Sequence, residues 1–166
     1  MVINYDFIKH WTELGDEREG YYLDQFFYYF VAFNCLYENV FVSSFPNPAD
    51  RKDKHERDKI YAFRKSLIYE HCKQNGFNPC EDLSKIPQLA RGVEEAEGSP
   101  FNSRNKILDN ENVELKEGKL FKNIYQVRCN LFHGQKYIKI QESRDFDLIK
   151  ECVGVLKSLL DAYLKH

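Results

Sequence analysis

The chain has 166 residues, of which 43% are apolar, 15% are aromatic and 30% are charged. This composition excludes an intrinsically disordered chain, and the length suits one globular domain over residues 1–166. The formal net charge of -2 argues against a broad electrostatic grip on nucleic acid, although a local basic site remains compatible with it.

The cysteines and the N-terminal residues indicate the compartment. The chain has an odd number of cysteines, and these five residues are widely spaced: Cys35, Cys72, Cys80, Cys129 and Cys152. No Cys/His set has the spacing of a zinc site, so we expect reduced, mostly buried thiols, no metal and no cofactor. Residues 1–11 do not resemble a signal peptide, and no apolar stretch reaches about 20 residues. We therefore expect a cytoplasmic protein without a membrane partner.

Residues 16–42 carry the pattern of a long helix. Aromatic residues recur there at steps of three and four: Tyr22, Phe26, Tyr29, Phe30, Phe33 and Tyr37. This spacing favours a core face over a surface that stacks bases. Asn34 lies on the same stripe and either bonds a buried partner or reaches a functional site. Glu38, one turn later, could pair with a basic residue of the motif at residues 128–134, which is described below.

Residues 50–74 predict a second helix. Its first half, residues 51–59, is almost entirely charged. This segment could bind an RNA backbone, or it could be a solvated helix face with i,i+4 ion pairs. We favour the solvated face. Arg64 and Lys65 lie on the better-packed half. They could contact an RNA phosphate, or their stems could simply cover apolar surface.

Residues 77–118 are less regular because prolines and glycines interrupt them. A short helix is expected over 83–95, followed by a polar excursion over 98–118. A loop of this length in a compact domain is often functional.

The last third predicts a helix over 119–132, a stop at Gly134, a brief extended piece over 137–140 and a final amphipathic helix capped by Ser143. Four helices with apolar faces and almost no strand signal indicate an all-α fold. We expect an antiparallel helical bundle with an irregular insertion around residues 77–118.

The most informative segment is Arg-Cys-Asn-Leu-Phe-His-Gly at residues 128–134. The guanidinium of Arg128 suits a phosphate, and the imidazole of His133 can transfer a proton near neutral pH. His133 could take the proton of a ribose 2′-hydroxyl, which then attacks phosphorus and leaves a 2′,3′-cyclic phosphate. Arg128 would stabilise the charge on the non-bridging oxygens. Asn130 could orient His133 or donate to a phosphate oxygen.

The spacing of Arg128 and His133 is a difficulty in a regular helix, because five residues leave the two side chains about 140° apart. The helix could end or tighten near Gly134, or the arginine stem could curl toward the helix end. A third possibility is that a second copy of the chain completes the site. From spacing alone, a surface arginine and a helix-capping histidine explain the same pattern.

The block IYQVRCNLFHGQK at residues 124–136 resembles the C-terminal motif of the HEPN superfamily (higher eukaryotes and prokaryotes nucleotide-binding domains). That motif is an arginine, four to six variable residues and a histidine on the penultimate long helix, which here is Arg128-x4-His133. One departure is Cys129, since catalytic members often carry a polar residue directly after the arginine.

The resemblance implies a four- to five-helix bundle that forms a homodimer, with two motifs facing each other. It implies a metal-independent endoribonuclease acting on single-stranded RNA, in antiviral defence or in a toxin–antitoxin pair with an antitoxin or other regulatory protein. Lys136 is a further RNA-binding candidate. The alternative is a non-catalytic dimeric module that binds a partner protein or a nucleotide, as other members of the family do.

Overall fold

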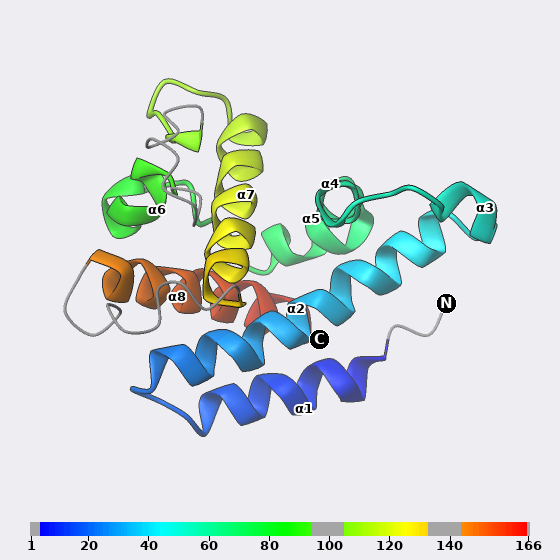
Figure 1. The fold of residues 1–166 in the computed structure, drawn as a ribbon, viewed down its shortest axis with the longest axis horizontal. Coiled ribbons are helices and arrows are strands. Elements are labelled where there is room, and N and C mark those ends of the chain that lie inside the picture. Colours follow the sequence, from blue (N-terminus) through cyan, green and yellow to red (C-terminus); the bar gives the residue numbers. More distant parts are fainter. Residues whose placement is uncertain (1–3, 94–104, 133–143, 166) are drawn as a thin grey trace. The chain divides into compact units, whose positions relative to one another are not determined.

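The computed structural model describes residues 4–93, 105–132 and 144–165. All its regular elements within these ranges are helical, which confirms the all-α class (Figure 1). The helices are α1 (Tyr5–Asp16), α2 (Tyr22–Ser44), α3 (Pro48–Arg51), α4 (Glu56–Arg64), α5 (Leu67–Gln74), the short 3-10 helix η1 (Leu83–Lys85), α6 (Pro87–Arg91), α7 (Val113–Phe132) and α8 (Arg144–Leu164). No helix among the described residues is both long and apolar enough to cross a membrane.

The chain divides into two compact units. The first holds residues 1–77 and 153–166, and the second holds residues 78–152. Helix α8 therefore contributes its C-terminal part to the first unit and its first turns to the second. The single domain expected from length stays a prediction.

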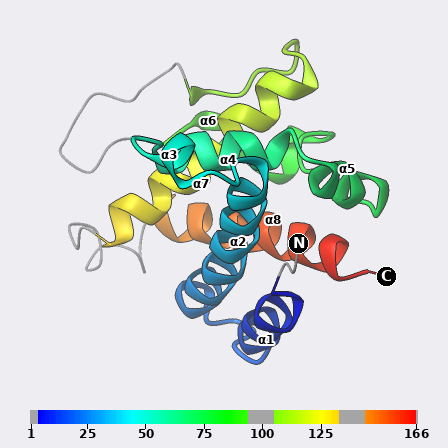
Figure 2. The same cartoon turned by 90° about the vertical axis from the view of Figure 1, so that its right-hand side faces the viewer.

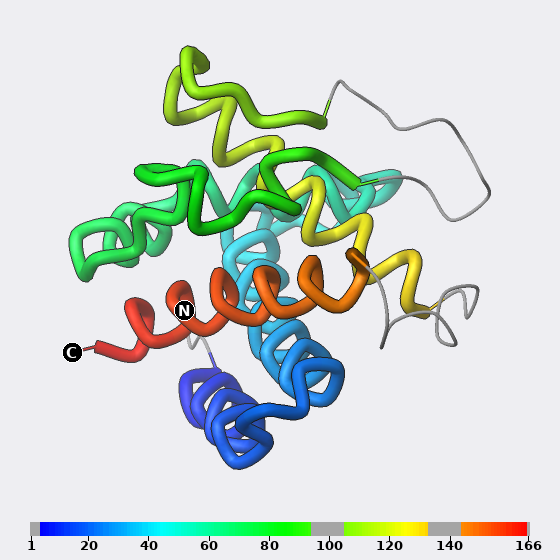
Figure 3. Tube along the Cα trace, turned by 90° about the vertical axis from the view of Figure 1, so that its left-hand side faces the viewer, coloured from blue at the N-terminus to red at the C-terminus, as the bar shows by residue number. Residues whose placement is uncertain are grey.

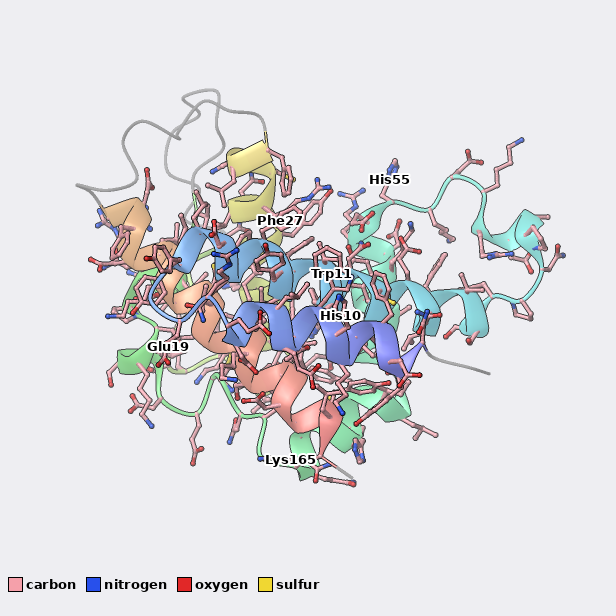
Figure 4. The ribbon with its side chains drawn as sticks, turned by 90° about the horizontal axis from the view of Figure 1, so that it is seen from below. His10, Trp11, Glu19, Phe27, His55 and Lys165 are labelled. Atoms are coloured by element: carbon pink, nitrogen blue, oxygen red, sulfur yellow. The ribbon has the colours of Figure 1, made fainter. Side chains whose placement is uncertain are left out.

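Helices α1 and α2 form an antiparallel pair in the first unit (Figure 1). Asn4 caps α1 by accepting a hydrogen bond from the backbone N–H of Phe7 at 3.2 Å. Gly20, with φ of 87°, lies in the turn between the helices, a conformation that glycine adopts without strain. The rings of Trp11 and Phe27 meet across the pair at 6.3 Å between centroids (Figure 4).

The structure corrects the predicted start of the first helix. The sequence pattern predicted a helix over 16–42, whereas residue 16 is the end of α1 and the next helix, α2, starts at Tyr22 after a turn. The core assignment of the aromatic stripe is confirmed, because its central members are at most 6% exposed: Phe26, Tyr29, Phe30, Phe33 and Tyr37. Tyr22, at the first position of α2, is only half-buried.

The segment 50–74 is three helices rather than one. Asp53 adopts a positive φ of 66° and separates α3 from α4. The Ser66 hydroxyl then accepts a hydrogen bond from the backbone N–H of Tyr69 at 3.2 Å and starts α5. Helix α4 packs across α2, as Figures 1 and 2 show from two directions.

The C-terminal part of α8 completes the first unit. Lys157 donates a hydrogen bond to Asp16 at 2.7 Å, and the hydroxyl of Tyr29 donates to the same carboxylate oxygen at 2.7 Å. Tyr163 near the end of α8 lies against Tyr5 at the start of α1, with 6.3 Å between the ring centroids. These contacts join α8 to α1 and α2, which lie much earlier in the sequence.

In the second unit the helix expected over 83–95 is split into η1 and α6. Pro87 disfavours a helical conformation at Ile86, and Gly92 with φ of 93° ends α6. Helix α6 packs against α7 (Figure 3). Asn123 of α7 contributes to this contact by donating to the carbonyl oxygen of Leu89 at 2.8 Å.

Two side chains of α8 hold α6 at its two ends. The carboxylate of Glu151 accepts from the backbone N–H of Gln88 at 3.1 Å and from that of Leu89 at 2.8 Å. At the other end, Arg144 donates to the carbonyl oxygen of Gly92 at 2.6 Å. These groups are the ones that a short helix leaves without partners, so the two side chains satisfy them.

Helix α7 begins at Val113, six residues before the start predicted at 119. The side chain of Asn112 accepts from the backbone N–H of Leu115 at 2.9 Å, which explains the earlier start. The last residues of the expected irregular segment 98–118 are therefore helical. The predicted extended piece over 137–140 and the cap at Ser143 lie outside the described residues.

Candidate functional site

The end of α7 carries the predicted RNA site. Residues Leu120, Ile124 and Val127 are at most 3% exposed and mark the buried face of the helix. Arg128 follows directly and is half-buried. Packing of the buried face sets the orientation of α7, and this orientation determines the position of the Arg128 guanidinium.

Two aromatic rings flank Arg128. The central guanidinium carbon lies 4.9 Å from the ring centroid of Phe132 and 5.9 Å from that of Tyr125. These rings are four residues after and three residues before Arg128, the spacings that bring side chains together on a helix. Both distances are within the range of a cation–π interaction. The guanidinium of Arg128 therefore contacts two aromatic rings, which do not neutralise its positive charge.

Asn130 occupies the other side of α7. It is 4% exposed, and its side-chain oxygen accepts a hydrogen bond from the amide of Gln126 at 2.8 Å. Two positions along a regular helix turn the side chain by about 200°, so Asn130 and Arg128 point to different faces. The geometry therefore fits a structural or positioning role for Asn130 better than a bond to a phosphate that Arg128 holds.

The other two predicted residues of this motif, His133 and Lys136, lie outside the described residues. The convergence of Arg128 and His133 on one phosphodiester therefore stays a prediction. So does the third possibility, completion of the site by a second copy.

Asn34 and Glu38 belong to a polar cluster between α2 and α4 in the first unit. Asn34 donates to the Oε1 atom of Glu56 at 3.0 Å, and the hydroxyl of Tyr37 donates to the same oxygen. Glu38 accepts a hydrogen bond from Lys59 at 2.5 Å. Of the two alternatives for Asn34, the structure therefore records bonds to neighbours on α2 and α4.

The phenol of Tyr37 remains a hydrogen-bond donor in this cluster. Burial raises the pKa of Tyr37, and its bond to the Glu56 carboxylate raises the pKa further. The charge pattern of the segment 51–59 predicted a solvated face, so Glu56 and Lys59 were not predicted as partners of α2. Their spacing of three residues could have indicated only their own ion pair, which has 3.8 Å between the charged atoms.

Arg64 and Lys65 lie at the C-terminal end of α4. Arg64 is half-buried and Lys65 is exposed. The ammonium of Lys65 lies 5.5 Å from the ring centroid of Tyr61, one turn earlier. The position of Lys65 over an aromatic face matches the expectation that its stem covers apolar surface.

The described residues contain no group of three or more His, Cys, Asp or Glu side chains that could hold a metal ion. Compared with known proteins, the chain matches no family model, no curated protein and no solved structure. The function of the chain is therefore inferred from the chemistry of residues 124–136 and from the local geometry of α7.

Proposed function

We propose that the chain is a metal-independent endoribonuclease of the HEPN type that cleaves single-stranded RNA. In this proposal two copies form a homodimer, and the activity serves defence or a toxin–antitoxin pair. The observation that carries the proposal is Arg128, a permanent cation in the last turns of α7 that is flanked by two aromatic rings and lies five positions before His133 in the sequence.

The proposed reaction needs only these side chains and the RNA. His133 takes the proton of a 2′-hydroxyl, and the resulting oxygen forms a bond to the adjacent phosphorus. The bond from phosphorus to the 5′-oxygen breaks, and this oxygen leaves with a proton from an imidazolium or from water. Arg128 binds the non-bridging oxygens and stabilises their charge in the transition state. Asn130 positions the end of the helix, and Lys136 contacts the RNA backbone.

The test is cleavage of a single-stranded RNA by the purified chain in the presence of EDTA. We expect products that end in a 2′,3′-cyclic phosphate, and no cleavage of DNA of the same sequence. Arg128→Ala and His133→Ala should each lower the cleavage rate by a factor of about 100 or more. The matched control is Arg18→Ala, which removes an exposed arginine at the turn after α1.

Two results would refute this proposal. The first is unchanged cleavage by both Arg128→Ala and His133→Ala, which would place the chemistry elsewhere. The second is the absence of RNA cleavage by the wild-type homodimer, which would favour the non-catalytic binding module. Arg128→Lys separates the contribution of charge from that of geometry, because it keeps the charge and removes the planar guanidinium that binds two phosphate oxygens.

A further inference from the structure

Phe132, the last residue of α7, is 56% exposed. Phe121, the other phenylalanine of this helix, is 1% exposed and belongs to its buried face. The exposed ring lies 4.9 Å from the guanidinium of Arg128. The guanidinium thus lies over the ring of an exposed residue, so a cation and an aromatic surface are close together at the end of α7.

This combination matches the chemistry of an unpaired nucleotide. A nucleotide joins a flat aromatic base to a phosphate through a few bonds, so one short stretch of protein surface can bind both parts. Proteins bind single-stranded nucleic acid with cations along the backbone and aromatic rings under the bases. Bases within a duplex are already stacked on each other, so a duplex would gain little from an exposed ring.

We propose that Phe132 is a stacking platform for one unpaired RNA base next to the phosphate held by Arg128. The ring of Tyr125 flanks Arg128 on the preceding turn and limits where the guanidinium can move. This inference rests on the proposed function, and it adds a base subsite and a reason for selecting single-stranded or looped RNA. Phe132 is a binding residue, since it takes no part in proton transfer.

A simpler role for the ring makes a different prediction. If Phe132 only shields the stem of Arg128, its loss affects phosphate binding whether or not the RNA carries a base. If Phe132 stacks on a base, removing the ring and removing that base abolish the same interaction, so their effects on RNA binding do not add. A combination of protein variants and abasic RNA therefore separates the two roles.

The probe is a single-stranded 2′-O-methyl RNA of about ten nucleotides, which cannot be cleaved because the nucleophile is blocked. A second set of probes carries an abasic residue at each position in turn. We expect Phe132→Leu to weaken binding of the intact probe about ten-fold, and Phe132→Trp to preserve it. One abasic position should weaken binding by wild type to a similar extent and have little effect on Phe132→Leu.

The control is Phe27→Leu, which removes another exposed ring, 43% exposed, from α2. It should leave binding unchanged. Equal binding by Phe132→Leu and wild type would overturn the inference. It would also be overturned if every abasic probe lost the same factor in affinity for Phe132→Leu as for wild type. If Phe132→Leu is silent while Arg128→Ala abolishes cleavage, only the base platform fails. If wild type neither binds the probe nor cleaves RNA, the proposed function fails as well.

Discussion

Gly15 in the last turn of α1 is the position where one added methyl group should have the clearest effect. An ideal Cβ at this residue would lie 2.3 Å from the Cε1 atom of Tyr29 and 2.6 Å from its Cδ1 atom. Carbon atoms pack at about 3.5–4.0 Å, so the Tyr29 ring would have to move by more than about 1 Å. That ring is fully buried, and its hydroxyl is bonded to Asp16 at 2.7 Å.

We expect Gly15→Ala to lower the free energy of unfolding by about 2 kcal/mol. Overpacking costs about 1–3 kcal/mol, and the strained hydrogen bond of Tyr29 adds about 1–2 kcal/mol. The better helix propensity of alanine offsets about 1 kcal/mol. For a chain of this size the net loss corresponds to a decrease of roughly 4–8 °C in the melting temperature.

The assay is thermal and urea unfolding, followed by circular dichroism and by the fluorescence of Trp11, the only tryptophan. Gly154→Ala is the matched control, because its Cβ would meet nothing within 4 Å, and it should be neutral or stabilising by up to about 1 kcal/mol. A Gly15→Ala protein as stable as wild type would refute the packing described between α1 and α2.

Three further predictions concern polar contacts and pH. Glu151→Gln leaves one acceptor for the two N–H groups at the start of α6 and should destabilise the protein by about 1–2 kcal/mol; an unchanged urea midpoint would count against this role. Tyr37→Phe removes one of the two donors from α2 to the Glu56 carboxylate and should lower the urea midpoint, whereas Tyr61→Phe at an exposed residue should not. Burial raises the pKa of the Cys72 thiol from 9.0 to about 12. The unfolded chain therefore loses this proton at a lower pH than the folded chain. The stability that the protonated thiol contributes is complete below pH 9 and is lost as the pH rises toward 12, by about 1.4 kcal/mol per pH unit. Unfolding free energies measured from pH 8 to pH 11 should therefore fall less steeply for Cys72→Ala, and identical slopes would exclude this cause.

The sequence predicted helices best where apolar residues follow a regular period over many turns. Helix α8, Arg144–Leu164, lies close to the predicted span because its buried positions repeat without interruption. The breaks in the segment 50–74 were not predicted, because a single positive φ at Asp53 and a serine cap at Ser66 decide them locally. Helix α1 was not predicted because two of its three buried residues, Thr12 and Gly15, are not large apolar side chains.

The site could be predicted where it depends on one helix. The spacing of Tyr125, Arg128 and Phe132 is enough to place two rings beside the guanidinium. The pairing of Glu38 with Lys59 could not be predicted, because it joins residues 21 positions apart on two helices that meet only in the folded chain. The exposure of Phe132 also needed the structure, because helical periodicity does not distinguish the edge of a buried face from its centre.

The contacts of α8 have a consequence for the synthesis of the protein. Lys157 meets Asp16, which precedes it by 141 positions, and Glu151 meets the start of α6, about 60 positions before it. A ribosome releases the N-terminal helices long before it makes these partners. The earlier helices therefore lack these contacts until α8 emerges, and each unit can complete its packing only then.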